Sequence, residues 1–134
     1  MASDRLWRNP KERRVILDSS SIMMLFEHSI DLEDELTRLL GKVEIIVPKP
    51  IVDELICLAE NGKGRKKRLA KPALKLIKDY KVIESEGKGD DSVLNLAKKL
   101  KAVVVTNDKE LRNRIKQESL KTIYLRGKKR LVLD

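Results

Sequence analysis

The sequence predicts an α/β protein in three layers, with a central parallel sheet of four to five strands between two layers of helices. Short runs of β-branched and aliphatic residues alternate with longer segments of helical periodicity along all 134 residues, which is the pattern of strand–helix–strand units. Aromatic residues make up only 3% of the chain against 41% apolar residues, so we expect an aliphatic core. The length favours one domain.

The elements follow one another in a regular order. Strands are expected at 13–18, 43–47, 81–84, 102–106 and 121–125. Helices are expected at 19–28, from Asp31 to a stop at Gly41, from Ile51 after two prolines, over a basic stretch ending near 79, and at 90–101 and about 109–117. Residues 1–12 are expected to form a basic lead, 13–126 the domain, and 127–134 a basic and apolar tail.

The charge balance points to a polyanionic partner. Thirty Lys and Arg residues against 21 Asp and Glu residues give a net charge of +9, which favours nucleic acid. No basic segment has a broad apolar face and no apolar run approaches the ~20 residues of a membrane span, so a membrane is not expected. One His and one Cys exclude a zinc cluster from this chain alone. The single Cys and the lack of an apolar leader fit a reducing, cytoplasmic location.

Four acids are expected at one edge of the sheet. Asp18 ends the first strand and Asp108 follows the fourth, and ligands of parallel sheets bind outside the carboxyl ends of the strands. At 100° per residue, Glu54 borders the apolar face of its helix whereas Asp53 points away. By the same argument Asp90 leans over the apolar face of its helix. Asp91 points away from that face, but it becomes the candidate if the helix begins one residue later.

Clustered acids suggest a site for a hard divalent cation. Carboxylates directed toward a core are costly unless they are paired, and Mg²⁺ or Mn²⁺ prefers oxygen ligands. Each acid also has a structural interpretation. Asp90 and Asp108 are suited to cap helices, and Glu54 is suited to the first turn of a helix, where it complements the dipole. The conjunction of all four favours the metal site. A phosphoacceptor or phosphatase domain ranks low, because such proteins carry an acid pair where this chain has Asp18-Ser-Ser.

The chain resembles a PIN domain from about residue 14 to 126. The stretches that carry the resemblance are VILDSS (15–20), VPKPIVDEL (47–55), GDDSVLNLA (89–97) and VVTNDKELR (104–112). Together with IYLR at 123–126, they are most similar to compact archaeal PIN proteins related to the eukaryotic small-subunit rRNA-processing nuclease. VapC toxins share the fold and the acids.

The resemblance implies an endoribonuclease that depends on Mg²⁺ or Mn²⁺. The acids of the family fall on Asp18, Glu54, Asp90 and Asp108, with Ser20 and Thr106 supporting the metal ligands. The implied partners are rRNA or pre-rRNA, an antitoxin or a ribosomal particle, and a second copy in a homodimer. A VapC-type toxin and a non-catalytic RNA- or ribosome-binding module remain alternatives. Candidate RNA-binding residues are the basic side chains of Arg65, Lys66, Lys67, Arg68, Lys71, Arg112 and Arg114.

Overall fold

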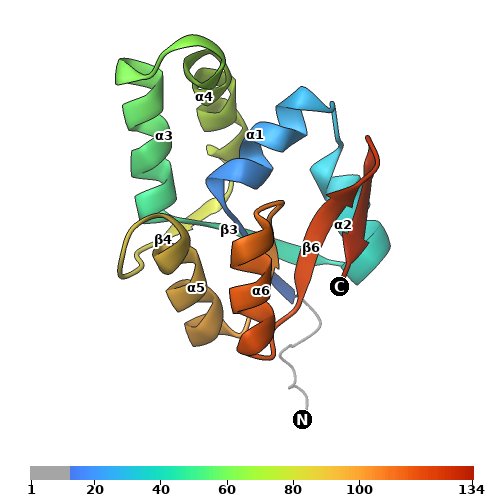
Figure 1. The fold of residues 1–134 in the computed structure, drawn as a ribbon. Helices are drawn as coiled ribbons and strands as arrows, with labels where there is room; N and C mark the ends of the chain where they lie inside the picture. Colours follow the sequence, from blue (N-terminus) through green and yellow to red (C-terminus); the bar gives the residue numbers. More distant parts are fainter. Residues whose placement is uncertain (1–12) are drawn as a thin grey trace.

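The computed structural model describes residues 13–134, and the expected lead at 1–12 lies outside the described residues. Its centre is a six-stranded sheet in the order β4-β3-β2-β5-β6-β7 (Figure 1). The first five strands in this order run parallel to one another, so the predicted parallel sheet is confirmed. The strands are β2 (Arg13–Leu17), β3 (Val43–Pro48), β4 (Lys81–Ile83), β5 (Val103–Val105), β6 (Thr122–Arg126) and β7 (Arg130–Leu133).

The sixth strand is the main difference from the sequence prediction. β7 pairs antiparallel with β6, with Leu131 opposite Leu125, and it lies in the stretch 127–134 that we expected to be a tail outside the domain. A turn makes this return possible, since Gly127 adopts a φ of 73° that costs glycine little. Burial stabilises it, because Leu131 is only 1% exposed.

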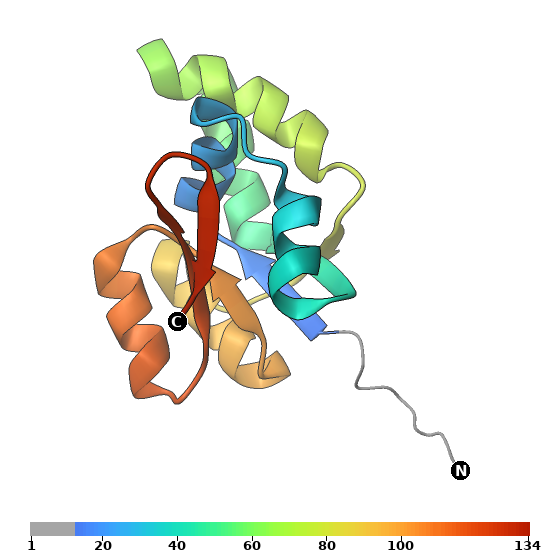
Figure 2. The same ribbon diagram turned by 90° about the vertical axis from the view of Figure 1, so that its right-hand side faces the viewer.

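The helices form layers on both faces of the sheet and a third group above its carboxyl edge. Helices α5 and α6 pack on one face and α2 packs on the other (Figure 2). Helices α1, α3 and α4 pack on one another beyond the carboxyl ends of the strands. Their bounds are α1 (Ser19–Glu27), α2 (Leu32–Leu40), α3 (Lys49–Asn61), α4 (Gly64–Ile77), α5 (Gly89–Leu100) and α6 (Lys109–Gln117).

The core is aliphatic, as the composition predicts. The three last residues of β2 and the three of β5 are buried in the middle of the sheet, where strands covered on both faces need continuous apolar runs. Both strands therefore end at the same buried edge, and the residues that follow them begin on the rim where α1 and α6 start. None of the helices within residues 13–134 has the length and apolar character needed to cross a bilayer.

Candidate active site

Asp18 is the most deeply buried acid of the described chain. It follows β2 directly, it is 3% exposed, and it caps α1 by accepting a hydrogen bond from the Ser21 backbone N–H at 2.8 Å. Its carboxylate also accepts hydrogen bonds from the hydroxyls of Ser20, at 2.9 Å, and Thr106. Burial raises the pKa of Asp18, and the bonds from Thr106, Ser21 and Ser20 oppose that rise.

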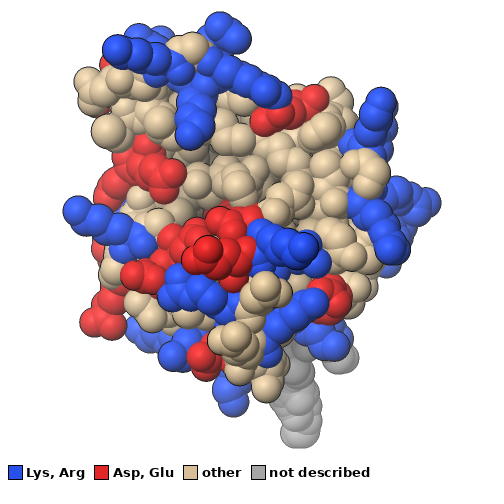
Figure 3. Space-filling model, viewed as in Figure 1, with Lys and Arg blue, Asp and Glu red and all other residues tan. Residues whose placement is uncertain are grey.

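Asp90 and Asp108 complete a group of three acids at this edge. Burial raises the pKa of Asp90 to about 6, and the negative charges of Asp108 and Asp18 add to the effect. Like charges raise one another's pKa only when they lie near each other, so Asp108 and Asp18 both lie near Asp90. Figure 3 shows acidic side chains gathered over the first turns of α5 and α6.

Asp108 acts as a helix cap and faces this acidic site at the same time. Its Oδ1 accepts hydrogen bonds from the backbone N–H groups of Glu110, at 2.9 Å, and Leu111, at 3.1 Å. Both bonds use the same oxygen, so Oδ2 takes no part in capping the helix. The capping interpretation of Asp108 is therefore compatible with a role as a ligand. Asp90, by contrast, lies inside the first turn of α5, whose N-cap is Lys88.

Asp91 lies apart from the three acids. Its side chain is 65% exposed and forms an ion pair with Arg114 of α6 at 2.8 Å. This pair joins the outer surfaces of α5 and α6. The structure thus brings Asp90 to Asp108 and Asp18, while Asp91 balances a surface cation.

Glu54 lines a groove beside the three acids. Helix α3 begins at Lys49 with Pro50 in its first turn, which places Glu54 half-buried and Asp53 exposed. Asp53 forms a surface ion pair with Lys49 at 2.6 Å. The groove has a volume of ≈ 390 Å³, and Ser20, which bonds Asp18, lies in its wall together with Glu54. The other lining residues are Ser19, Met23, Glu27, Leu58, Arg65, Lys66 and Leu69.

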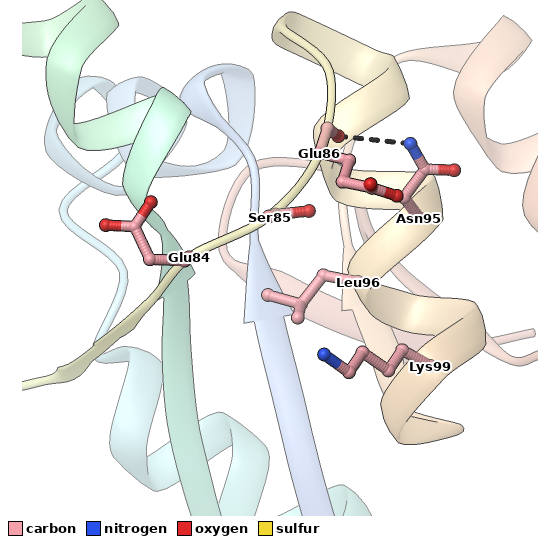
Figure 4. Close-up of a pocket in the computed structure, with 6 residues that line it drawn as sticks. All are labelled: Glu84, Ser85, Glu86, Asn95, Leu96 and Lys99. Atoms are coloured by element: carbon pink, nitrogen blue, oxygen red, sulfur yellow. Dashed lines mark hydrogen bonds between the residues drawn. The ribbon is translucent and has the colours of Figure 1, made fainter.

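Three hydrogen bonds that the sequence analysis did not foresee fix the loop before Asp90. The Ser85 hydroxyl donates to the Ser92 carbonyl at 2.6 Å, and the Ser92 hydroxyl donates to the Gly89 carbonyl at 2.7 Å. The Asn95 amide donates to the Glu86 carbonyl at 3.0 Å, as Figure 4 shows. Ser92 and Asn95 lie within the 89–97 motif. Their polar side chains interrupt the apolar periodicity of the helix, which is the sequence signal from which these hydrogen bonds could have been inferred. The hollow in Figure 4, ≈ 600 Å³, lies between this loop and α5.

The donor set suits a hydrated hard cation. Within residues 13–134, no group of three or more Asp, Glu, His or Cys side chains is arranged so that it could hold a metal ion. Mg²⁺, however, is commonly held by one or two carboxylates and keeps several waters. The neighbouring Asp90 and Asp108, with Asp18 beside them, fit this mode. A bound cation would also relieve the mutual repulsion that raises the pKa of Asp90.

Comparison with known proteins shows the family to which the chain belongs. A family model described as "PIN like domain" matches residues 15–128. The chain belongs to the PIN-domain family. The resemblance noted from the four motifs is therefore confirmed, and the PIN domain spans nearly all of the described residues.

Two curated relatives cover almost the full length of this PIN domain. Ribonuclease VapC9 of Archaeoglobus fulgidus is 32% identical over 134 residues, which is 100% of this chain and 98% of the relative. Ribonuclease VapC4 of Methanocaldococcus jannaschii is 33% identical over 121 residues, covering 87% of this chain and 92% of the relative.

Among solved structures, the PIN domain endonuclease Utp24 superposes with a TM-score of 0.77 at 23% identity, covering 92% of each chain. A domain of a functionally unknown protein from Methanocaldococcus jannaschii gives a TM-score of 0.58 at 18% identity, covering 91% of this chain and 99% of that one. These similarities establish the shared fold.

The basic candidates of the PIN domain differ in how far their charge is already balanced. Arg112 is half-buried, with its guanidinium 3.7 Å from the centre of the Tyr124 ring and 3.6 Å from Asp134. Arg114 pairs with Asp91, and Arg65 pairs with Glu27 at the wall of the groove. Among residues 13–134, the remaining candidates have no carboxylate at ion-pair distance. They are Lys66, Lys67, Arg68 and Lys71, all exposed on α4.

Proposed function

We propose that this PIN domain is a metal-dependent endoribonuclease that hydrolyses RNA phosphodiesters. The observation that carries the proposal is that the Thr106 hydroxyl bonds both Asp18 and the Asp108 backbone N–H at the carboxyl edge of the sheet, with Asp90 near enough for both acids to raise its pKa. Similarity to two proteins named ribonucleases, over 100% and 87% of this chain, supports the choice of substrate. The net charge of +9 suits a polyanion.

Asp90 and Asp108 would hold Mg²⁺ or Mn²⁺, with Asp18 completing the negative site. When bound, such an ion supplies charge neutralisation at a phosphoryl oxygen and a water that is nucleophilic at neutral pH. Thr106 and Ser20 would keep the Asp18 carboxylate in one orientation through the hydrogen bonds described above. Glu54 would act from the groove side, on a second ion or on the attacking water.

The RNA would approach across the groove between α1, α3 and α4. Arg65 and Lys66 line that groove next to Glu54, and phosphate contacts of this kind position a nucleic acid without reading its sequence. Figure 3 shows the basic side chains of α4 above the acidic centre of the same face. An RNA strand held by α4 would therefore run toward the acids.

The test is cleavage of an end-labelled structured RNA with Mn²⁺ or Mg²⁺, compared with EDTA. We expect cutting that requires metal, that falls at least about 100-fold in Asp90→Asn, and that stays within about threefold in Asp91→Asn. The two variants remove the same charge from adjacent positions of α5. If no RNA is cut with either metal while salt-sensitive binding persists, the chain is a non-catalytic RNA-binding module.

The biological role has two candidates. Processing of rRNA in ribosome biogenesis is the first, and the fold shared with Utp24 is compatible with it. A VapC-type toxin paired with an antitoxin is favoured by the names of the two curated relatives. Two experiments separate them. In a bacterial host, expression of a toxin arrests growth only when its acids are intact, and a small co-expressed partner restores growth. In the native cell, depletion of a processing enzyme leads to accumulation of uncut pre-rRNA.

A further inference from the structure

The turn between β6 and β7 carries a dense group of cations. Four of the five residues from Arg126 to Arg130 are basic, namely Arg126, Lys128, Lys129 and Arg130, and all four are exposed. We call this segment, residues 126–130, the hairpin tip. It was not among the basic residues singled out from the sequence, because the stretch was expected to be a tail.

The hairpin tip lies at the same edge of the sheet as the acids. β6 runs parallel to β5, so its carboxyl end rises on the side where Asp18 and Asp108 stand. Asn107, directly before Asp108, accepts a hydrogen bond from the Leu125 backbone N–H at 2.8 Å. The segment that carries Asp108 is thereby fastened to the residue that precedes the tip. Both views show the hairpin rising beside α1 (Figures 1 and 2).

The hairpin is held firmly from the other face of the sheet. The Leu131 backbone N–H donates to Glu35 of α2 at 2.8 Å, and the Leu131 carbonyl accepts from Arg38 at 2.8 Å. Glu35 and Arg38 are themselves paired at 2.9 Å. The strand that returns from the tip is therefore anchored at its first residues, and the cations are presented from a fixed support.

The positive charges of the hairpin tip destabilise the hairpin itself. Arg126 and Arg130 stand directly opposite each other across the two strands, and like charges in such a pair are destabilising. Among residues 13–134, none of the four cations has a carboxylate at ion-pair distance. An exposed, anchored turn that keeps a destabilising pair of like charges is typical of a functional position. An anion placed between the strands would relieve the repulsion.

We propose that the hairpin tip is a second phosphate-binding surface for RNA, placed across the acidic rim from the basic residues of α4. The inference rests on the proposed ribonuclease function and adds to it a second grip on the substrate. Figure 3 shows basic side chains over α4 and, apart from them, along the right-hand edge where the hairpin lies, with the acidic cluster on the same face. RNA that contacts both basic surfaces would be held on this face, close to the acids.

The test compares two triple variants in which the same amount of positive charge is removed. The first is Arg126→Gln, Lys128→Gln, Lys129→Gln in the hairpin tip. The control is Lys98→Gln, Lys99→Gln, Lys101→Gln at the C-terminal end of α5, which precedes β5 and so lies at the amino edge of the sheet. Binding of labelled single-stranded RNA is measured in EDTA, where no cleavage occurs, at several salt concentrations.

We expect the tip variant to bind about 10- to 100-fold more weakly at 0.1 M salt. Its slope of log affinity against log salt should flatten by about 0.7 for each phosphate group that the tip no longer neutralises. The control should change by less than about threefold. The tip variant should also melt no lower than the wild type, because removing Arg126 ends the opposition to Arg130. The variant Lys128→Arg, Lys129→Arg should keep wild-type binding.

Equally weakened binding in the two triple variants would reduce the effect to net charge and overturn the proposal. Unchanged binding in the tip variant would also overturn the proposal. The tip would then be a candidate binding surface for an acidic protein. The wild type is also assayed for metal-dependent cleavage of the structured RNA that tests the proposed function. Weakened binding in the tip variant without any cleavage by the wild type would refute the ribonuclease function and leave the RNA-binding tip standing.

Discussion

The hydroxyl of Thr106 links the buried Asp18 to the chain segment that carries Asp108. It donates a hydrogen bond to Oδ2 of Asp18 and accepts one from the Asp108 backbone N–H at 3.0 Å. Thr106 itself is fully buried. One side chain thus sets the orientation of one acid and the position of another, although β2 and β5 supply them from distant parts of the sequence.

We expect Thr106→Val to lower stability and activity together. Valine keeps the shape of the side chain but removes one of the donors to the buried Asp18 carboxylate and the acceptor of the Asp108 backbone N–H. Leaving a buried polar group unsatisfied costs about 1–3 kcal/mol. Urea unfolding should show a decrease of this size, and RNA cleavage should fall by about tenfold or more. Thr106→Ser keeps the hydroxyl and should retain most of both. An equal decrease of cleavage in the two variants would mean that the methyl group, not the hydrogen bonds, matters.

Asp90 gives the metal-free protein a distinctive pH dependence. Its pKa is raised from 3.8 to about 6 in the folded state, so between these values the folded state binds more protons than the unfolded state. The contribution of Asp90 to stability is therefore full below pH 3.8 and is lost as the pH rises through 6. In EDTA, Asp90→Asn should be more stable than the wild type at pH 7, by about 1 kcal/mol after solvent screening is allowed for.

The same substitution should remove the stabilisation that metal provides. Melting curves with and without Mn²⁺ at pH 7 should show an upward shift in the wild type, because a ligand that binds the folded state stabilises it. The shift should be nearly absent in Asp90→Asn and retained in Asp91→Asn. A wild-type melting temperature that does not change when Mn²⁺ is added would count against a metal site at these acids.

The orientation of the acids could be predicted because it depends on local periodicity. Glu54 and Asp90 lie on the inner side of their helices and Asp53 and Asp91 on the outer side, as the 100° rotation per residue requires. The meeting of Asp18 with Asp108 follows from the rule that parallel strands share a carboxyl edge. These inferences need only the order of the elements.

The remaining features depend on interactions between distant residues. The return strand β7 follows a turn without an Asn-Gly or Asp-Gly signal, and it is stabilised by Glu35 and Arg38 of α2, more than 90 residues earlier in the sequence. Arg112 was grouped with the RNA-binding residues from its charge, whereas its guanidinium packs on Tyr124. No periodicity in the sequence encodes either pairing.

Glu54 and Asp53 offer a matched pair on α3. Glu54→Gln changes a residue of the groove wall beside Ser20, and we expect cleavage to fall by about tenfold with little change in stability. Asp53→Asn removes only a solvent-exposed ion pair with Lys49, which contributes little to stability, and should leave cleavage within about twofold. Equal cleavage by both variants would exclude Glu54 from the active site.

The hydrogen bonds of the Leu131 backbone with Glu35 and Arg38 of α2 predict that β7 is held firmly. Arg38→Gln removes the donor to the Leu131 carbonyl and the ion pair to Glu35. Because the bond to the Leu131 carbonyl is part-buried, its loss should lower the free energy of unfolding and speed the hydrogen exchange of the backbone amides in β7. Arg14→Gln is the control, since its ion pair with Glu44 is exposed at 3.8 Å and should contribute less than about 0.5 kcal/mol. If hydrogen exchange in β7 is unchanged by Arg38→Gln, burial of Leu131 alone holds the strand. The hydrogen bonds from α2 then contribute nothing measurable to its stability.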